Sequence, residues 1–318
     1  MKLAEEHSPQ PRVVTVDAEQ DGQRIDNFLL RHMKGVPRSH VYRILRRGEV
    51  RVNKGRIRAG YRLRSGDRVR IPPVRQAAPR TAPRPPHGLL QRLEQAILYE
   101  DADLMVLDKP AGIAVHGGSG LQFGIIESLR VLRPDEPLEL VHRLDRDTSG
   151  CLLVAKRREA LLDLQAQLRA GELHKRYLAL ILGDWKGGRR TVSAPLRKNV
   201  VRGGERVVRV SERGKVATSV FSPVARLSGA TLMEVELTTG RTHQIRVHAA
   251  EVGHPLAGDP KYGSAEFNRR MRRYGLKRLF LHAYALGFRR PASGKELYIS
   301  APLDPALQRV LDRLEGET

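Results

Sequence analysis

The feature that most constrains the fold is a stretch rich in proline and arginine, residues 72–86. It contains six prolines and three arginines and almost no large apolar side chain. Proline fixes φ and removes a backbone donor, so such a stretch favours an extended, semi-rigid chain that cannot build a core. Residues 74–88 are therefore predicted to link a small domain to a large one. The linker is either fully solvated or touches phosphate through its arginines.

The N-terminal part has the pattern of a small α/β domain. Residues 1–12 are predicted to be a polar lead, and residues 13–73 the domain itself. One helical repeat of apolar residues begins near Arg24, and a second runs from Pro37 to Gly48, a residue typical of helix ends. Short alternating segments separated by turn residues favour small strands. These segments are residues 13–16, 50–52 and 69–71.

Net charge points to a polyanion as the partner. Lys and Arg total 57 against 35 Asp and Glu, which gives a formal charge of +22. Nucleic acid and an anionic membrane both fit that number. Between residues 38 and 70, however, 12 Lys or Arg face only two acidic residues. Most charge runs are solvated faces, but a surplus on one compact unit favours RNA binding. The candidate RNA contacts are Arg38, Arg43, Arg46, Arg47, Arg51 and Lys54.

The most informative stretch of the large domain, residues 89–318, is residues 138–155. Two apolar runs flank a group of charges, and Thr148-Ser149-Gly150 predicts a tight turn. A carboxylate at Asp145 would lie at a strand end beside arginines and an apolar wall. Such surroundings suit an ionised nucleophile, but an Asp–Arg pair that only fixes a loop fits the spacing too. Spacing alone leaves both interpretations open.

Several other segments of the large domain have recognisable patterns. Residues 158–170 predict a helix that ends at Gly171, with four leucines facing inward: Leu161, Leu162, Leu164 and Leu168. Residues 174–181 predict a strand, residues 185–240 a run of strands, and residues 239–248 the start of a helix. The glycine-rich loop 116–120 lacks the Gly-Lys-Ser/Thr of a phosphate-binding loop, so a mobile loop beside the site is the better interpretation. Residues 269–278 predict a basic, exposed insertion.

The sequence favours a cytosolic protein without a metal. The first residues lack the apolar core of a signal peptide, and no apolar run reaches the length of a bilayer. Cys151 is the only cysteine, so no intrachain disulfide can form. His243 and His248 are spaced poorly for a shared zinc ion on a helix, and no carboxylate or thiolate lies near them in sequence.

Residues 142–150, His-Arg-Leu-Asp-Arg-Asp-Thr-Ser-Gly, resemble the signature of the RluA-type pseudouridine synthases, His-Arg-Leu-Asp-x-x-Thr-Ser-Gly. The resemblance implies that Asp145 is the catalytic residue. Asp147 falls on an open position and inherits no role. Tyr177 matches the tyrosine of the family's Lys-x-Tyr-x-Ala motif, which places it in the active site. Arg246 matches the arginine that forms a salt bridge with the catalytic aspartate, and Arg143 is a candidate for holding RNA where the base has left.

The resemblance also covers the small domain and sets the expected fold class. Residues 39–53 are similar to the S4 RNA-binding domain. The implied fold is α+β: a small S4-like RNA-binding domain and a catalytic domain with a mixed, mainly antiparallel sheet. Residues 115–120 and 208–211 are most similar to the branch of the family that acts on 23S ribosomal RNA.

The function implied by the resemblance is the isomerisation of chosen uridines to pseudouridine in 23S ribosomal RNA or a large-subunit precursor. The base must leave the stack to be cut and rejoined. Asp145 either attacks the ribose or removes its 2′ proton. No cofactor, metal, membrane or small-molecule substrate is expected, and the protein is expected to be a monomer. Transfer RNA or other ribosomal uridines are alternative substrates. A catalytically silent S4-bearing assembly factor is a further alternative, against which Asp145, Tyr177 and Arg246 argue.

Overall fold

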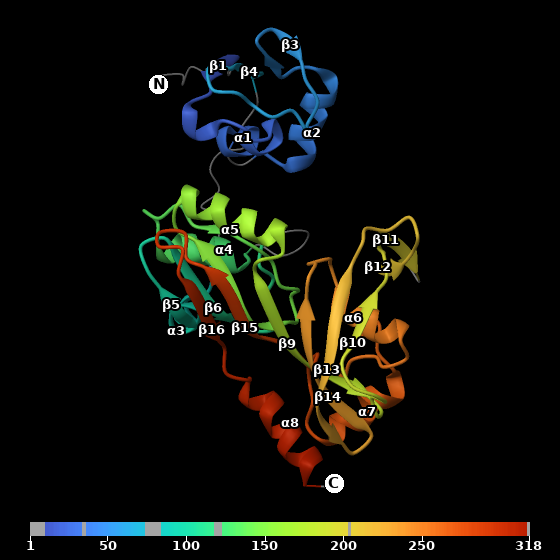
Figure 1. Ribbon diagram of the computed structural model, residues 1–318. Coiled ribbons are helices and arrows are strands. Elements are labelled where there is room, and N and C mark those ends of the chain that lie inside the picture. The colour runs from blue at the N-terminus through green and yellow to red at the C-terminus, as the bar shows by residue number, and fades with distance from the viewer. Residues whose placement is uncertain (1–9, 34–35, 74–83, 118–122, 203–204, 317–318) are drawn as a thin grey trace, which may run out of the picture. The chain divides into compact units, whose positions relative to one another are not determined.

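The computed structural model describes residues 10–33, 36–73, 84–117, 123–202 and 205–316. The chain forms two units, Met1–Pro83 and Arg84–Thr318, which are described separately (Figure 1). Most of the expected polar lead and of the expected linker lies outside the described residues, as do residues 118–120 of the glycine-rich loop.

In the small unit, two helices cover an antiparallel sheet with the order β1-β4-β2-β3. The helix α2 follows Pro37 and ends at Gly48, whose φ of 70° lies in the left-handed region that glycine adopts readily. Asn53 and Lys54 also have positive φ and connect β2 to β3 in a tight hairpin. The apolar faces of both helices form the core with the sheet. The elements are α1 (Ile25–His32), α2 (Arg38–Arg47), β1 (Arg12–Thr15), β2 (Arg51–Val52), β3 (Gly55–Arg56) and β4 (Arg68–Ile71).

The large unit is built on a ten-stranded sheet. Its main path runs β10-β13-β14-β9-β15-β8-β6-β5, while β16 pairs with β15 and β7 with β8. Within the described strands only β15 and β8 pair in parallel, so the sheet is mixed and mainly antiparallel, as expected. The strands are β5 (Ile97–Glu100), β6 (Leu104–Lys109), β7 (Glu139–Leu140), β8 (Ser149–Ala155), β9 (His174–Leu182), β10 (Arg190–Ser193), β13 (Thr218–Leu227), β14 (Ala230–Leu237), β15 (Leu281–Arg289) and β16 (Glu296–Ser300).

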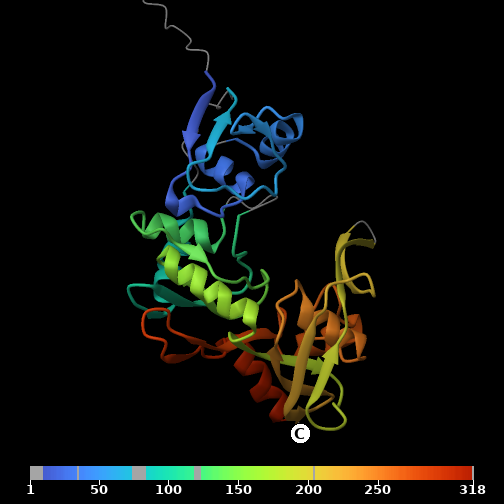
Figure 2. The same cartoon turned by 45° about the horizontal axis from the view of Figure 1, so that its top comes forward.

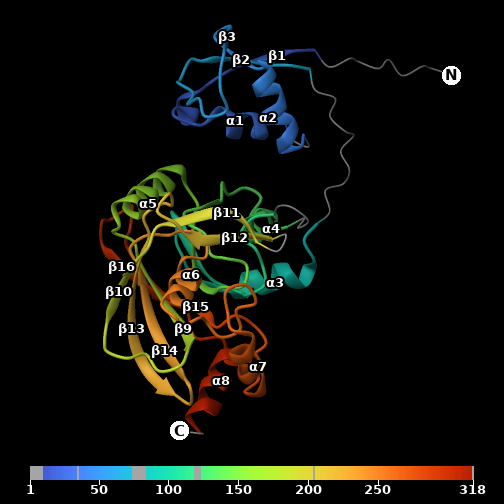
Figure 3. The same cartoon turned by 90° about the vertical axis from the view of Figure 1, so that its right-hand side faces the viewer.

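Helices pack on this sheet and on one another. In Figure 3, α3 lies beside α4, and α7 lies beside α8. The helix α6 contacts β13 and the separate two-stranded ribbon of β11 and β12, which extends from the unit in Figure 2 (yellow). The bounds are α3 (His87–Gln95), α4 (Ile125–Leu132), α5 (Arg158–Ala170), α6 (Gln244–Glu251), α7 (Ala265–Arg273), α8 (Pro305–Glu315), β11 (Leu196–Arg202) and β12 (Glu205–Val210).

Three local predictions differ from the structure. Residues 269–278 are not an exposed insertion, because they include the end of α7 and bury Met271 and Leu276. Leu162 is 52% exposed, because the apolar stripe of α5 follows its neighbours Leu161 and Leu164. Ser149 and Gly150 belong to β8, and the tight turn lies earlier, where the Thr148 N–H donates to the Asp145 carbonyl. Gly150 is needed for close strand packing, since a Cβ there would come within 2.2 Å of the Ala283 carbonyl oxygen on β15.

No helix in the described parts of the chain is long and apolar enough to cross a bilayer.

Candidate active site

The candidate site is a pocket of about 160 Å³ in the large unit. Three stretches distant in sequence line it: the loop 142–148, the start of β9, and residues 240–246 at the beginning of α6. Asp145, Tyr177, Arg246 and Arg143 all contribute to its lining, so the structure brings together the four residues that the sequence placed at one site.

The loop that carries Asp145 is held at both ends by hydrogen bonds. His142 accepts a hydrogen bond from the Leu153 N–H on β8, 3.1 Å from its Nε2. Burial, with the nearby charge of Lys175, lowers the pKa of His142 to about 3, so the ring stays neutral and keeps that acceptor. The Arg146 carbonyl accepts a hydrogen bond from the Gly112 N–H at 2.8 Å. The backbone around Asp145 is therefore fixed independently of its side chain.

Lys109 at the end of β6 is the second anchor of this loop. Its side chain is fully buried, and its Nζ donates to the carbonyls of Pro110, Ile113 and Arg146 at 2.8, 2.8 and 3.1 Å. Burial lowers the pKa of Lys109 to about 7, with a further contribution from the charge of Arg278. Three acceptors match the three N–H donors of the ammonium form. A satisfied buried cation thus ties β6 to the catalytic loop.

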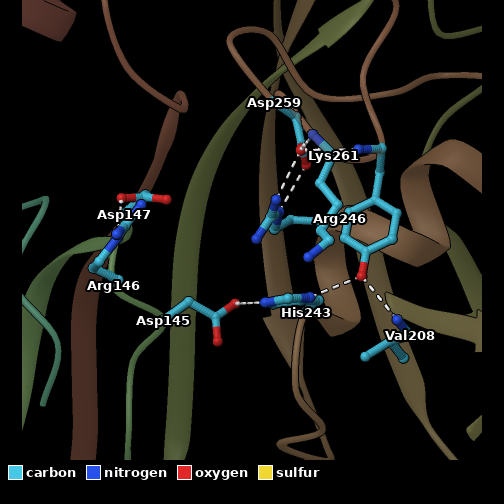
Figure 4. Close-up of polar contacts among 9 residues, drawn as sticks. Asp145, Arg146, Asp147, Val208, His243, Arg246, Asp259 and Lys261 are labelled. Carbon is cyan, nitrogen blue, oxygen red and sulfur yellow. Dashed lines mark hydrogen bonds and ion pairs between the residues drawn. The ribbon is translucent and has the colours of Figure 1, made fainter. Parts of the chain in front are cut away.

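Asp145 and Asp147 point in different directions from this loop (Figure 4). The Asp145 carboxylate faces His243, with 3.9 Å between Oδ2 and Nε2. Asp147 accepts a hydrogen bond from the exposed Arg146 side chain at 3.2 Å and borders a different hollow of the surface. Only Asp145 reaches the pocket formed by β9 and α6.

A chain of hydrogen bonds orients His243 toward Asp145. The Val208 N–H donates to the Tyr262 hydroxyl at 3.0 Å, and that oxygen lies 2.8 Å from Nδ1 of His243 (Figure 4). Burial raises the pKa of Tyr262 and lowers that of His243, so both are neutral near pH 7. We assign the tyrosine proton to the bond with Nδ1, which leaves the ring's own N–H on Nε2, facing the Asp145 carboxylate.

Arg246 forms its ion pair with Asp259 rather than with Asp145, the partner that the resemblance implied. Nε and one terminal nitrogen of the guanidinium donate to the two carboxylate oxygens, both at 2.7 Å. Asp259 also accepts the N–H groups of Lys261 and Tyr262, at 2.8 and 3.0 Å. This carboxylate lies in the loop after α6, which closes back on the helix and brings Asp259 to the guanidinium. The charge of Asp145 still acts on Arg246 and helps to raise its pKa.

Tyr177 combines a core position with a place in the pocket. Its ring belongs to the main apolar cluster of the large unit, and it also lines the site. Burial raises its pKa well above the usual value, and the charge of Asp145 raises it further. The phenol is therefore neutral at physiological pH and presents a ring and a hydroxyl close to the candidate catalytic carboxylate.

Arg143 and most of the candidate RNA contacts of the small unit are exposed. Arg143 is an exposed part of the pocket lining. In the small unit, contacts within the described residues are local: Arg43 with His40, and Arg46 with the Tyr42 carbonyl. Arg43, Arg46, Arg47 and Lys54 are exposed and Arg51 is half-buried, while Arg38 begins α2 and its side chain lies outside the described residues.

Sequence reasoning missed several residues of the site. His243 was considered only as a metal ligand, and no cluster of three or more metal-ligating side chains occurs in the described ranges. Asp259 and Tyr262 belong to the run Gly-Asp-Pro-Lys-Tyr-Gly, residues 258–263. An aspartate and a tyrosine in so short a polar run after the predicted helix were the available signal. Lys175 lies two residues before Tyr177, and the period of two along a strand places both on one face.

Comparisons with known proteins agree with this geometry. A family model described as RNA pseudouridylate synthase matches residues 103–251, and one described as S4 domain matches residues 23–69. The chain is 54% identical over 308 residues to a Pasteurella multocida protein named ribosomal large subunit pseudouridine synthase C, covering 96% of this chain and 94% of that one. The chain belongs to the RNA pseudouridylate synthase family. An Escherichia coli protein of the same name is 53% identical over 315 residues, covering 97% and 98% of the two chains.

Solved structures support the same family fold for the large unit. The human RNA pseudouridylate synthase domain containing 4 superposes with a TM-score of 0.60 at 27% identity, over 71% of this chain and 95% of that one. The human RNA pseudouridylate synthase domain containing 1 superposes with a TM-score of 0.56 at 26% identity, over 66% of this chain and 83% of that one. The family and the α+β architecture expected from residues 142–150 and 39–53 are therefore confirmed.

Proposed function

We propose that the protein isomerises chosen uridines of 23S ribosomal RNA, or of its large-subunit precursor, to pseudouridine. The observation that carries the proposal is the pocket itself. One carboxylate, Asp145, lines it together with the buried Tyr177 and the buried Arg246, which is paired with Asp259. Support for the RNA comes from relatives that share more than half of their residues over nearly their full length and are named for the ribosomal large subunit.

Asp145 is the proposed catalytic residue. The reaction breaks the bond between uracil N1 and ribose C1′, turns the detached base and joins it again through C5. A base inside a helix cannot turn, so the uridine is flipped into the pocket first. Asp145 then either attacks C1′ or removes the 2′ proton. The neutral His243 N–H faces the carboxylate across 3.9 Å and stabilises its negative charge in both cases.

The other pocket residues have distinct proposed roles. Tyr177 stacks on the flipped base, and its hydroxyl is placed to take part in removal of the C5 proton. Arg143, exposed in the pocket lining, binds RNA where the base has left the helix. Arg246 acts through its charge and through Asp259, because its two hydrogen bonds fasten α6 to the loop that carries Tyr262.

The small unit is proposed to bind RNA through the exposed side of α2 and the hairpin after it. Residues 13–73 form the proposed RNA-binding domain, residues 74–88 the linker and residues 89–318 the catalytic domain. The reaction needs no cofactor, since no electrons are exchanged with an outside group. Cytoplasmic location and a monomeric state belong to the proposal, and light scattering of the purified protein tests the second.

Pseudouridine mapping in ribosomal RNA tests the function directly. Cells that lack the protein are compared with cells that carry the wild-type protein or Asp145→Asn at equal abundance. We expect particular sites in 23S RNA to lose pseudouridine without the protein, to regain it with the wild type and not with the variant. Changes confined to transfer RNA would move the proposal to another substrate. Unchanged modification in every RNA would refute enzymatic function and favour an assembly factor.

A further inference from the structure

Lys175 is a buried cation of the pocket that the mechanism has not used. It lies on β9, on the same face as Tyr177, and its side chain lines the pocket. The residue is only 6% exposed. Its Nζ lies 3.8 Å from the position that a Cβ on Gly240 would occupy, at the beginning of the loop that leads to α6. Within the described residues, the structure gives the Lys175 ammonium no hydrogen bond and no ion pair.

The other two cationic residues that are buried in the described part of this unit, Lys109 and Arg246, both have polar partners. Lys109 donates to three carbonyls, and Arg246 donates twice to Asp259. Burial alone lowers the pKa of Lys175, to about 8, because no neighbouring carboxylate offsets it. An unpaired charge largely shielded from water is costly, and titratable groups with such shifted pKa values cluster at functional sites. Lys175 is such an unpaired cation, and it lies in the pocket that is proposed to receive the base.

Resting on the proposed function, we propose that Lys175 binds the uracil anion that forms when the N1–C1′ bond breaks. The bonding electron pair stays on N1 and is delocalised onto O2 and O4, the oxygens that the ammonium meets. When C5 attacks C1′, the electron pair of the anion forms the new C5–C1′ bond, while the Asp145 carboxylate is released from C1′ or the proton that it holds returns to C2′. The C5 proton then moves to N1, so the product is an isomer of unchanged composition. Both possible actions of Asp145 release the same anion, so the inference holds for either.

The position of Lys175 indicates that it binds the base rather than a phosphate group of the RNA. Exposed arginines can reach phosphates that stay in solvent, and the lining of this pocket includes two of them, Arg143 and Arg241. Lys175 lies beside the tyrosine ring on which the base is proposed to stack. A fixed cation aimed at the place where negative charge develops stabilises the transition state more than the ground state.

Lys175→Met keeps the length of the side chain and removes the charge. We expect single-turnover formation of pseudouridine to fall by about 10²–10³-fold, the effect of losing one such electrostatic contact. RNA affinity and its salt dependence should stay the same. The melting temperature should rise, since an unpaired buried charge is gone. Exposed Lys186 provides the control, because Lys186→Met removes the same charge outside the pocket.

The pH profile separates this role from a purely structural one. In the wild type, kcat/KM should fall as pH rises through about 8, where Lys175 loses its proton. Lys175→Arg retains the charge at all these pH values, so the alkaline fall should disappear while part of the activity remains.

Three results would overturn the inference. Wild-type turnover in Lys175→Met, or a lower melting temperature, would make the lysine structural. A loss of RNA affinity with one fewer counterion released would make it a phosphate contact. An unchanged alkaline fall in Lys175→Arg would assign that proton to another group. If the wild-type enzyme forms no pseudouridine in RNA, it is the proposed function that fails.

Discussion

In each unit an arginine holds an aspartate with two hydrogen bonds, and the two ion pairs differ in exposure. In the small unit, Arg24 donates to Asp26 at 3.1 and 2.7 Å, and the arginine side chain is 47% exposed. In the large unit, Arg246 donates to Asp259 at 2.7 Å twice, and its side chain is 6% exposed. Water screens the first pair and barely reaches the second. The same kind of ion pair is therefore a solvent-screened contact in the small unit and a buried structural part of the site in the large unit.

The remaining charges follow the same division. Candidate RNA contacts of the small unit are mostly exposed and have local partners, so their effect on an RNA should depend on how many there are. Several charges next to the pocket are buried and held at single positions, as for Lys109 and Arg246. In the large unit one substitution should then change activity strongly, whereas in the small unit several are needed for a modest effect.

The largest effect is expected for Asp145→Asn. Loss of the catalytic carboxylate should lower turnover by about 10⁴-fold or more while RNA affinity remains near that of the wild type. Asp147→Asn is the matched control, one residue beyond Arg146 on the same loop but facing elsewhere. It should retain most of the activity. Single-turnover rates and binding isotherms for both variants measure this, and an equal loss in the two would point to a pair of reacting carboxylates.

Tyr177 should show the next largest effect on turnover. Tyr177→Phe keeps the ring and removes the hydroxyl, so RNA should bind about as well, since stacking contributes roughly 1–3 kcal/mol. If the hydroxyl serves in C5 proton removal, turnover falls by about 10²–10⁴-fold after the glycosidic bond has been cut. Tyr177→Ala should lose binding, turnover and stability together.

A core tyrosine would behave differently in the same measurements. Full activity in Tyr177→Phe, with a lower melting temperature only in Tyr177→Ala, would assign the residue to packing. The structure makes this comparison sharp, because the ring takes part in both the apolar cluster and the pocket.

Replacing the arginine of each ion pair compares how much the two pairs contribute to the free energy of unfolding. Arg246→Gln leaves a buried carboxylate without its counter-charge and should lower the free energy of unfolding by about 3–5 kcal/mol. Arg24→Gln should cost much less, because water reaches the Arg24 side chain and the Asn27 N–H and Tyr42 hydroxyl still donate to Asp26. Urea unfolding at pH 7 measures both. Similar costs would mean that burial does not separate the two pairs.

The pH dependence of the Arg246→Gln effect has a definite sign. Burial opposes ionisation of Asp259, but the hydrogen bonds and charge of Arg246 outweigh it and hold the pKa below its usual value. A lowered pKa in the folded state contributes stability above the unfolded value of about 3.9, and this is lost as pH falls through the folded value. The difference in free energy of unfolding between wild type and variant should thus be largest at neutral pH and decrease below about pH 4.

How far the sequence could predict the site depends on the range of the contacts. Helix ends at Gly48 and Gly171 were predictable, since both glycines have positive φ for local reasons. The family motifs named Asp145, Tyr177 and Arg246, and the structure places them together. Which carboxylate Arg246 would meet was not predictable, because a loop after α6 brings Asp259 closer. Leu162 was mispredicted since apolar character alone does not say which side of a helix is covered.

The smallest effect per residue is expected from the exposed arginines of the small unit. Arg43, Arg46 and Arg47 lie on α2, and each phosphate contact on a single strand releases roughly 0.7 counterions. Replacing all three with Gln should reduce the slope of log affinity against log salt by about 2, with turnover on saturating RNA unchanged. The control triple, Arg58, Arg64 and Arg68, removes the same charge from exposed positions outside that helix. Equal losses in both triples would show that the unit attracts RNA through its net charge, whereas a loss only in the α2 triple would locate the contact there.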